Sequence, residues 1–304
     1  MGETFSMGID LGGTKTYAVV LNGAGQVVWD RRVATPASEY EEVIRMLAAL
    51  AQSARDALGT RPTLGIGGPG SLTPEGLLKN SNTLCLNGRP LLRDLEAAAG
   101  QPARFANDAN CLALSEATDG AGAGAPVVFA AILGTGTGAG ITVHGRVLGG
   151  PNGLAGEWGH NPLPWADARE DPVFDCYCGQ HGCNETLLSG PGIARDHGLR
   201  TGVSLSAAEI SLRARQGDAD CSATLERHAS RLARALAGVI NLLDPDVMVL
   251  GGGLSLMPQL YQRVPALWGR WVFSGGLKEP VRTALRPSLH GDASGVRGAA
   301  WLWR

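Results

Sequence analysis

Several features that define membrane, secreted and nucleic-acid-binding proteins are missing from this sequence of 304 residues. It contains no apolar run of about 18 residues, so we expect no transmembrane helix. The formal net charge is only −2 at pH 7, whereas binding to nucleic acid or to an anionic membrane requires a basic surface. The N-terminal residues form neither the cationic nor the apolar segment of a signal peptide. We therefore expect a cytoplasmic protein that binds neither nucleic acid nor membranes.

Aromatic residues are also scarce, at 5%, whereas glycine is abundant, with 44 residues. This is about twice the usual glycine content. The glycines follow no G-X-Y period, which excludes collagen, and they cluster between apolar runs, which excludes a low-complexity linker. The length corresponds to roughly two domains. What remains is a globular chain with many tight turns or many places where the backbone approaches a ligand closely.

Glycine-rich turns occur in two similar strand–turn–strand patterns. The first turn, 10–15 (DLGGTK), lies between two apolar strands, and the second, 134–138 (GTGTG), lies between strands predicted at 127–133 and 139–143. Neither turn matches a P-loop, and neither opens a helix as a dinucleotide-binding turn does. Either turn alone could be an ordinary hairpin turn, but the pair favours contact with a triphosphate from two sides. Asp10 could hold the water shell of Mg²⁺, and Lys15 could either contact phosphate or be solvated.

Two later apolar strands also end at glycine clusters. The strand predicted at 63–67 runs into 68–70, and the strand predicted at 246–250 runs into 251–253. Ligands of open α/β sheets bind beyond the carboxyl ends of the strands. The repeated arrangement therefore predicts two related α/β domains whose turns and strand ends face one cleft.

A polar group, Asn107-Asp108, stands between a short predicted strand and a helix predicted to begin near Ala109. One of the two residues could simply cap the helix. Alternatively, an aspartate at the cleft end of a strand could accept a hydroxyl proton while the neighbouring asparagine orients the substrate.

Three of the six cysteines lie close together, at positions 176, 178 and 183. With the upstream His160 they form a Cys₃His set, and four such ligands without an open position are typical of structural zinc. Three free cysteines by chance and ligation by His181 are the alternatives. A metal that fixes His160 would also fix the neighbouring Glu157 and Glu185, so we interpret zinc as a scaffold that activates no water.

Together, the DLGGT turn, the Asn-Asp pair, the G-T-G-x-G turn, the E-x-G-H segment, the C-x-C-x₄-C-x-E segment and the D-P-D-x-x-V-L-G-G-G strand resemble the ROK family (repressor, open reading frame, kinase). The resemblance covers nearly the whole chain in the family's order. It implies the actin-like, ribonuclease-H-like ATPase fold, with two α/β domains around an interdomain cleft. We expect an N-terminal domain at 1–118 plus a C-terminal helix at 293–304, and a larger domain at 119–292 that carries the zinc site.

The resemblance also implies roles for individual residues. Asp108 matches the catalytic base of the family's kinases, which phosphorylate hexoses with ATP and Mg²⁺. The residues that match sugar ligands are Asn107, Asp108, Glu157, His160 and Glu185. The residues that match zinc ligands are His160, Cys176, Cys178 and Cys183. The residues that match the binding site for the nucleotide and its metal are Asp10, Gly12, Gly13, Thr14, Lys15, Gly134, Thr135, Gly136, Thr137, Gly138, Gly252 and Gly253.

The sequence is similar to the bacterial fructokinase and mannokinase branch, for example in its GHNPLPW segment at 159–165. We therefore expect fructose, and also mannose, as the phosphate acceptor, and a homodimer. A glucokinase or a kinase of N-acetylated hexosamines is the alternative. A sugar-responsive repressor of the same family is disfavoured, because only nine residues precede Asp10 and leave no room for a DNA-binding domain.

Overall fold

The chain forms two compact units in its computed structural model, which describes residues 4–277 and 279–304. Unit 1 contains the residues up to Gly124 together with Gly140–Ala155 and Leu289–Arg304, and unit 2 contains Ala125–Ala139 and Gly156–Ser288. The domain boundaries inferred from the sequence, at 118/119 and 292/293, stay predictions. Within the described residues, no helix has both the length and the apolar character that a membrane span requires.

Unit 1 is built on a five-stranded sheet with the order β3-β2-β1-β4-β7. The first three strands form an antiparallel meander, in which Leu11 pairs with Thr16 across the predicted glycine turn, and β4 and β7 continue the sheet in parallel. Its strands are β1 (Ser6–Leu11), β2 (Lys15–Leu21), β3 (Val27–Ala34), β4 (Thr63–Gly68) and β7 (Ala103–Asn107), with a small ribbon of β5 (Ser71–Leu72) and β6 (Leu78–Lys79).

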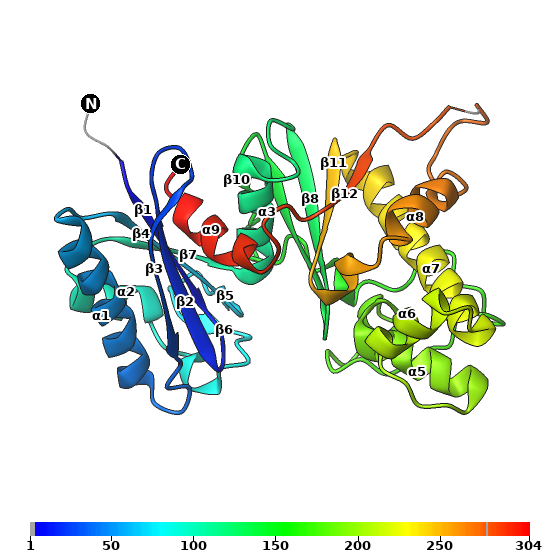
Figure 1. Cartoon of the computed structure of the whole chain (residues 1–304), viewed down its shortest axis with the longest axis horizontal. Coiled ribbons are helices and arrows are strands. Elements are labelled where there is room, and N and C mark those ends of the chain that lie inside the picture. The colour runs from blue at the N-terminus through cyan, green and yellow to red at the C-terminus, as the bar shows by residue number, and fades with distance from the viewer. Residues whose placement is uncertain (1–3, 278) are drawn as a thin grey trace. The chain divides into compact units, whose positions relative to one another are not determined.

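Helices cover both faces of this sheet. Helices α1 (Tyr40–Leu58) and α2 (Leu91–Ala99) lie on one face, and α3 (Asp108–Asp119) and α9 (Ser294–Trp301) lie on the other (Figure 1). The helical spacing of apolar residues predicts the first of these helices at 40–58, and these bounds are confirmed. Its buried residues recur with helical spacing, two glutamates occupy its first turn, and Arg55 lies in its last turn, where it complements the helix dipole. Short 3₁₀ turns complete the unit at Leu84–Leu86 and Gly291–Ala293.

The second sheet has the order β10-β9-β8-β11-β12, and the chain passes from unit 2 to unit 1 within β9. Strands β8, β11 and β12 are parallel. Its strands are β8 (Val127–Leu133), β9 (Thr137–Val143), β10 (Arg146–Val147), β11 (Val247–Gly251) and β12 (Ala284–Pro287). The helices of unit 2 are α4 (Glu185–Leu188), α5 (Gly190–Thr201), α6 (Ala207–Arg215), α7 (Ala219–Leu243) and α8 (Leu260–Trp268), with 3₁₀ turns η2 (Trp158–His160) and η3 (Gly253–Leu256).

The α/β character and the two strand–turn–strand patterns predicted from the sequence are confirmed. Some predicted elements differ in extent. The amphipathic pattern at 231–243 predicts a helix there, but the helix begins at Ala219, because the side chain of Asp218 accepts a hydrogen bond from the N–H of Cys221 and caps it earlier. The C-terminal helix expected at 293–304 is shorter and spans Ser294–Trp301. The second glycine turn is shorter than 134–138, because Thr137 and Gly138 already belong to β9.

Candidate functional site

The first glycine turn lies between β1 and β2 and exposes Gly13, Thr14 and Lys15. Two hydrogen bonds from Thr35 hold the shape of the turn. Its hydroxyl donates to the carbonyl of Gly12 at 2.7 Å, and its N–H donates to the carbonyl of Thr14 at 3.0 Å. Thr35 therefore fixes the backbone of the turn, and the exposed residues 13–15 remain accessible to a ligand. Such a loop can present backbone N–H groups to an anion.

Asn107 and Asp108 stand at the junction of β7 and α3. The side-chain oxygen of Asn107 accepts a hydrogen bond from the N–H of Asn110 at 2.8 Å, so Asn107 is the helix cap, as one of the two sequence interpretations had it. Asp108 is the first residue of the helix, and its Oδ1 accepts from the N–H of Ala109 at 2.8 Å. Capping occupies the amide oxygen of Asn107 and leaves its NH₂ group and the second carboxylate oxygen of Asp108 for a ligand.

Asp10 and Asp108 are coupled electrostatically within unit 1. Burial, and then the charge of Asp108, raise the pKa of Asp10 to about 6. The side chain of Asp108 reaches solvent, but the surrounding protein withdraws enough water to raise its pKa as well. Carboxylates that resist ionisation in this way lack a compensating cation. The environment of Asp10 therefore fits a hydrated Mg²⁺, which binds through one or two carboxylates and keeps several waters.

The Cys₃His set predicted from spacing comes together in unit 2. The ligand atoms of His160, Cys176, Cys178 and Cys183 all lie within 4.8 Å of one another. Two of the separations are 3.5 Å, from Cys176 Sγ to His160 Nδ1, and 3.7 Å, from Cys178 Sγ to Cys183 Sγ. Tetrahedral zinc with Zn–S of about 2.3 Å and Zn–N of about 2.0 Å requires separations of about 3.5 and 3.8 Å. The donor set therefore fits zinc.

His181, the alternative ligand, lies outside this cluster. Its Nδ1 is 2.8 Å from Asp175 Oδ1, in an exposed pair across the loop 175–183, which we call the zinc knuckle. The two residues form an isolated β-bridge that shapes the loop carrying Cys176 and Cys178. We therefore assign His181 to the framework of the knuckle.

The ring of His160 connects the cysteine cluster to a tyrosine that the sequence reasoning missed. Nδ1 faces the sulfur atoms, and the opposite nitrogen, Nε2, is 3.1 Å from the hydroxyl of Tyr177. A ring nitrogen must be unprotonated to bind a cation, so with zinc on Nδ1 the ring proton would reside on Nε2 and be donated to Tyr177. Although the ring is largely exposed, partial desolvation of the hydroxyl, followed by the charges of Glu185, Cys176 and Glu157, raises the pKa of Tyr177.

Glu185 links the zinc knuckle to the second glycine turn. Its Oε2 accepts a hydrogen bond from the N–H of Thr137 at 2.8 Å. A β-carbon at Gly136 would lie 2.7 Å from this oxygen, so a side chain there would push the carboxylate away. Thr137 Oγ1 is buried and has no hydrogen-bond partner among the described residues, which leaves it available to a ligand.

Glu157 and His160 are held against the same turn. Glu157 immediately precedes η2, and the N–H of His160 donates to its carbonyl at 3.2 Å. A β-carbon at Gly159 would lie 1.8 Å from the carbonyl of Thr137, so only glycine permits this approach. The buried Asn184 donates to the carbonyl of Trp158 at 2.9 Å and fastens η2 to α4. The family resemblance implies an apolar or β-branched residue at this position.

A cavity of about 700 Å³ opens beside the second turn. It contains three of the residues predicted to bind the nucleotide, Gly134, Thr135 and Gly253. Gly252 lies next to it, with φ of 78° at the start of η3. The sequence reasoning missed the rest of the lining, because α5 and α6 were not predicted. The other residues that line it are Gly190, Pro191, Ala194, Ser206, Ala207, Ala208, Ser211, Arg215, Leu254, Leu256 and Met257.

The missed helices do carry local signals. Ser189 and Ser206 cap α5 and α6, a proline lies in the first turn of α5, and Ser206 and Glu209 form a capping box. The cavity is mostly apolar, with a few hydroxyl groups and one guanidinium group from Arg215. Its size and lining suit a flat heteroaromatic group attached to a polar chain.

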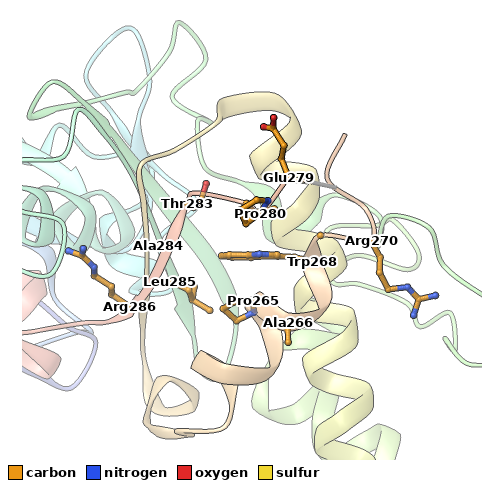
Figure 2. Close-up of a pocket in the computed structure, with 12 residues that line it drawn as sticks. Pro265, Ala266, Trp268, Arg270, Glu279, Pro280, Thr283, Ala284, Leu285 and Arg286 are labelled. Atoms are coloured by element: carbon orange, nitrogen blue, oxygen red, sulfur yellow. The ribbon is translucent and has the colours of Figure 1, made fainter. Parts of the chain in front are cut away.

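Unit 2 contains a second cavity, of about 610 Å³, between α8 and β12. The ring of Trp268 lies between Pro280 and the pair Pro265 and Leu285, and the side chains of Arg270, Glu279 and Arg286 point away from it (Figure 2). None of the predicted site residues lines this cavity. We therefore assign the chemistry to the turn, knuckle and first cavity.

The predicted site residues are thus divided between the units. Asp10, Gly12–Lys15, Asn107 and Asp108 belong to unit 1. Glu157, His160, the cysteines, Glu185 and both remaining glycine segments belong to unit 2. That these two groups act on one substrate stays a prediction.

Comparison with known proteins gives consistent results along the whole chain. A family model described as "ROK family" matches residues 6–304. The chain is 40% identical to an N-acetyl-D-glucosamine kinase of Erwinia tasmaniensis, over 97% of this chain and 98% of the relative. It is 37% identical to an N-acetyl-D-glucosamine kinase of Escherichia coli, over 97% and 98%.

Solved structures agree on the architecture. A ROK hexokinase from Thermus thermophilus superimposes with a TM-score of 0.86 at 31% identity, covering 98% of this chain and 97% of the other. A ROK glucokinase from Streptomyces griseus, solved in complex with glucose and AMPPNP, gives a TM-score of 0.73 at 28% identity, covering 98% of each chain. The actin-like ATPase fold expected from the sequence is confirmed.

Proposed function

The chain belongs to the ROK family and is a sugar kinase, and from this premise we propose that it transfers the γ-phosphate of ATP to a hydroxyl of N-acetyl-D-glucosamine. The observation that carries the choice of sugar is the identity of about 40%, over nearly the full length, to kinases of that sugar. A change of a few atoms in the pocket alters the preference between two sugars by only a few kcal/mol. For the choice of acceptor sugar we therefore rely on similarity over the whole chain rather than on any single contact.

This proposal replaces the expectation of fructose as the main acceptor. That expectation was based on the similarity of three short segments, 107–113, 159–165 and 294–303, to the fructokinase and mannokinase branch. The curated relatives favour the alternative interpretation, a kinase of an N-acetylated hexosamine. Glucose is the second candidate, since the Streptomyces griseus glucokinase, solved with glucose and AMPPNP, is 28% identical to this chain over 98% of its length.

Asp108 is the proposed catalytic base. A carboxylate at the start of α3 with one free oxygen can accept the hydroxyl proton of the sugar as the phosphoryl group is transferred. The raised pKa of Asp108 increases its basicity and so matches that task. The NH₂ group of Asn107 is proposed to orient the same sugar, while its oxygen stays committed to the helix cap.

The nucleotide is proposed to bind through both glycine turns and the adjacent cavity. The turn at Gly12–Lys15 in unit 1 and the turn at 134–138 in unit 2 would both contact the phosphates, and Gly252 and Gly253 would lie near the ribose and base. Asp10 would hold the hydrated Mg²⁺ that neutralises the phosphate charge. The apolar lining from α5, α6 and η3 would accept the adenine.

Zinc is proposed as a structural ion held by His160, Cys176, Cys178 and Cys183. When bound, it would cross-link the knuckle to η2. The ligands fill a tetrahedron, so no position remains to activate water. The residues it positions are Glu157, Glu185 and the Nε2 of His160, which are proposed to hold the sugar hydroxyls together with Asn107 and Asp108. A homodimer remains a prediction.

The proposal is tested by coupled ADP-release kinetics with ATP and Mg²⁺ across N-acetylglucosamine, N-acetylmannosamine, glucose, fructose and mannose. We expect the highest kcat/KM for N-acetylglucosamine. A tenfold higher value for glucose or fructose would refute the choice of acceptor, and no turnover with any sugar would refute the kinase assignment. Phosphorus NMR of the product identifies the hydroxyl that is phosphorylated.

A further inference from the structure

Tyr177 makes an unusual contact for a side chain so exposed. Its relative exposure is 84%, so little apolar area is buried by its present position. Nevertheless its hydroxyl is 3.1 Å from His160 Nε2, and the two rings meet edge to face with centroids 5.2 Å apart. The phenol is thus held chiefly by one ring and one hydrogen bond.

With Nδ1 bound to zinc, the nitrogen that Tyr177 contacts would carry the only proton of the ring. Nδ1 of the same ring is turned to the cysteine cluster, 3.5 Å from Cys176 Sγ, so Nε2 is the only free edge of the ring. An N–H group of this kind serves one acceptor well. A sugar oxygen that accepts from Nε2 must therefore replace the hydroxyl of Tyr177.

Displacement of Tyr177 is sterically and energetically simple. The ring is exposed, so its movement uncovers little apolar surface. The cost is one hydrogen bond, which contributes about 1 kcal/mol net in proteins. The hydroxyl therefore opposes sugar binding by a modest and measurable amount.

We infer that Tyr177 sets the sugar affinity of this protein, because its hydroxyl occupies the His160 Nε2–H until a sugar oxygen takes its place. The inference rests on the proposed function, since it assumes that His160 contacts the acceptor sugar. It assigns to Tyr177 a role in substrate binding and none in phosphoryl transfer. The knuckle thereby contributes to affinity as well as to structure.

The test is Tyr177→Phe, which removes the hydroxyl and keeps the ring. Isothermal titration of N-acetylglucosamine without ATP should give a Kd about fivefold lower than that of the wild type. The wild type should also show a tyrosine difference spectrum on sugar addition that Tyr177→Phe lacks. Zinc content, measured by atomic emission, should be equal in the two proteins.

Tyr17→Phe is the matched control. Tyr17 lies in β2 with Arg32 stacked 4.2 Å from its ring centroid, and its substitution should leave the Kd unchanged. An unchanged or higher Kd for Tyr177→Phe would overturn the inference, and so would a difference spectrum that persists in that variant. If the wild type phosphorylates N-acetylglucosamine while Tyr177→Phe binds it equally well, only this inference fails. If the wild type binds no hexose, the proposed function fails with it.

Discussion

Glu185 Oε2 accepts a hydrogen bond from the backbone N–H of Thr137 at 2.8 Å. This contact joins a residue proposed to bind sugar to a turn proposed to bind phosphate, although 48 positions separate the two in the chain. A charged acceptor on a backbone donor is among the stronger hydrogen bonds in proteins. The position of the carboxylate and the shape of the turn therefore depend on each other.

Glu185→Gln should weaken both functions of this contact. The amide keeps an oxygen but loses the charge that strengthens the bond, so we expect KM for the sugar to rise at least tenfold and kcat to fall. Steady-state kinetics with the sugar and ATP varied separately measure both effects. Glu226→Gln is the control, because Glu226 forms an exposed pair with Arg263 that contributes little to stability. A variant with wild-type KM and kcat would contradict the role of Glu185.

Asp108→Asn should remove the proposed base while preserving most of the site. The amide is nearly isosteric and can still accept from the N–H of Ala109. We expect turnover to fall by several orders of magnitude, since asparagine cannot accept the proton, while the Kd for the sugar changes little. Rapid-quench kinetics and titration calorimetry measure the two quantities. Turnover close to that of the wild type would exclude Asp108 as the base.

Cys178→Ser should impair metal retention and sugar binding together. Serine is a poor zinc ligand, and the loss of one of four ligands frees the knuckle from η2. We expect lower zinc content, a lower melting temperature and a higher sugar Kd. Cys221→Ser is the comparison, because Cys221 lies buried in α7 outside the cluster and should retain zinc. Active wild-type protein without zinc would refute the structural role of the metal.

The raised pKa of Asp10 predicts that the stability of the protein depends on pH in a specific way. Its pKa of about 6 in the folded protein exceeds the value of 3.8 for a free aspartate. Between these values the folded state binds more protons than the unfolded state, so the free energy of unfolding falls as pH rises from about 4 to about 6. Asp10→Asn should flatten this part of the profile and raise the stability of the ligand-free protein at pH 7.

Urea unfolding at a series of pH values checks this prediction, with Asp30→Asn in the exposed part of β3 as the control. Asp108 contributes with the same sign, so part of the slope should remain in Asp10→Asn. The same variant should lose activity with Mg-ATP, because it lacks the carboxylate proposed to hold the metal. An unchanged profile would mean that Asp10 is not the group that resists ionisation.

Local patterns in the sequence predicted much of the fold. The bounds of α1 follow from helical spacing of apolar residues, and the hairpin of β1 and β2 follows from two apolar strands around a glycine turn. The zinc ligands follow from the close spacing of three cysteines after a histidine. In each case the residues that interact lie near one another in the chain, so a short segment contains the information.

Helices α5 and α6 were missed because their faces are less regularly apolar than that of α1, and packing on α7 stabilises them. A buried network shows the same principle. Arg231 and Arg234 on α7 pair with Asp171 at 2.9 and 2.7 Å, and Arg231 also pairs with Asp196 on α5 at 3.0 Å. Charged residues in a sequence normally predict solvent exposure, because an unpaired charge is costly to bury. Only the tertiary structure shows which opposite charges come together and allow burial.

The sequence by itself determined the family, the glycine turns, the Asn-Asp junction and the cluster of His160 with three cysteines, because residue types at a short spacing reveal each of them. The tertiary structure decided which partners meet over long distances in the chain: Glu185 with Thr137, Gly159 with the carbonyl of Thr137, and the cavity formed by α5, α6 and η3. It also placed the hydroxyl of Tyr177 on His160. Contacts of this kind depend on how elements pack, and packing is a property of the whole fold that no single segment encodes.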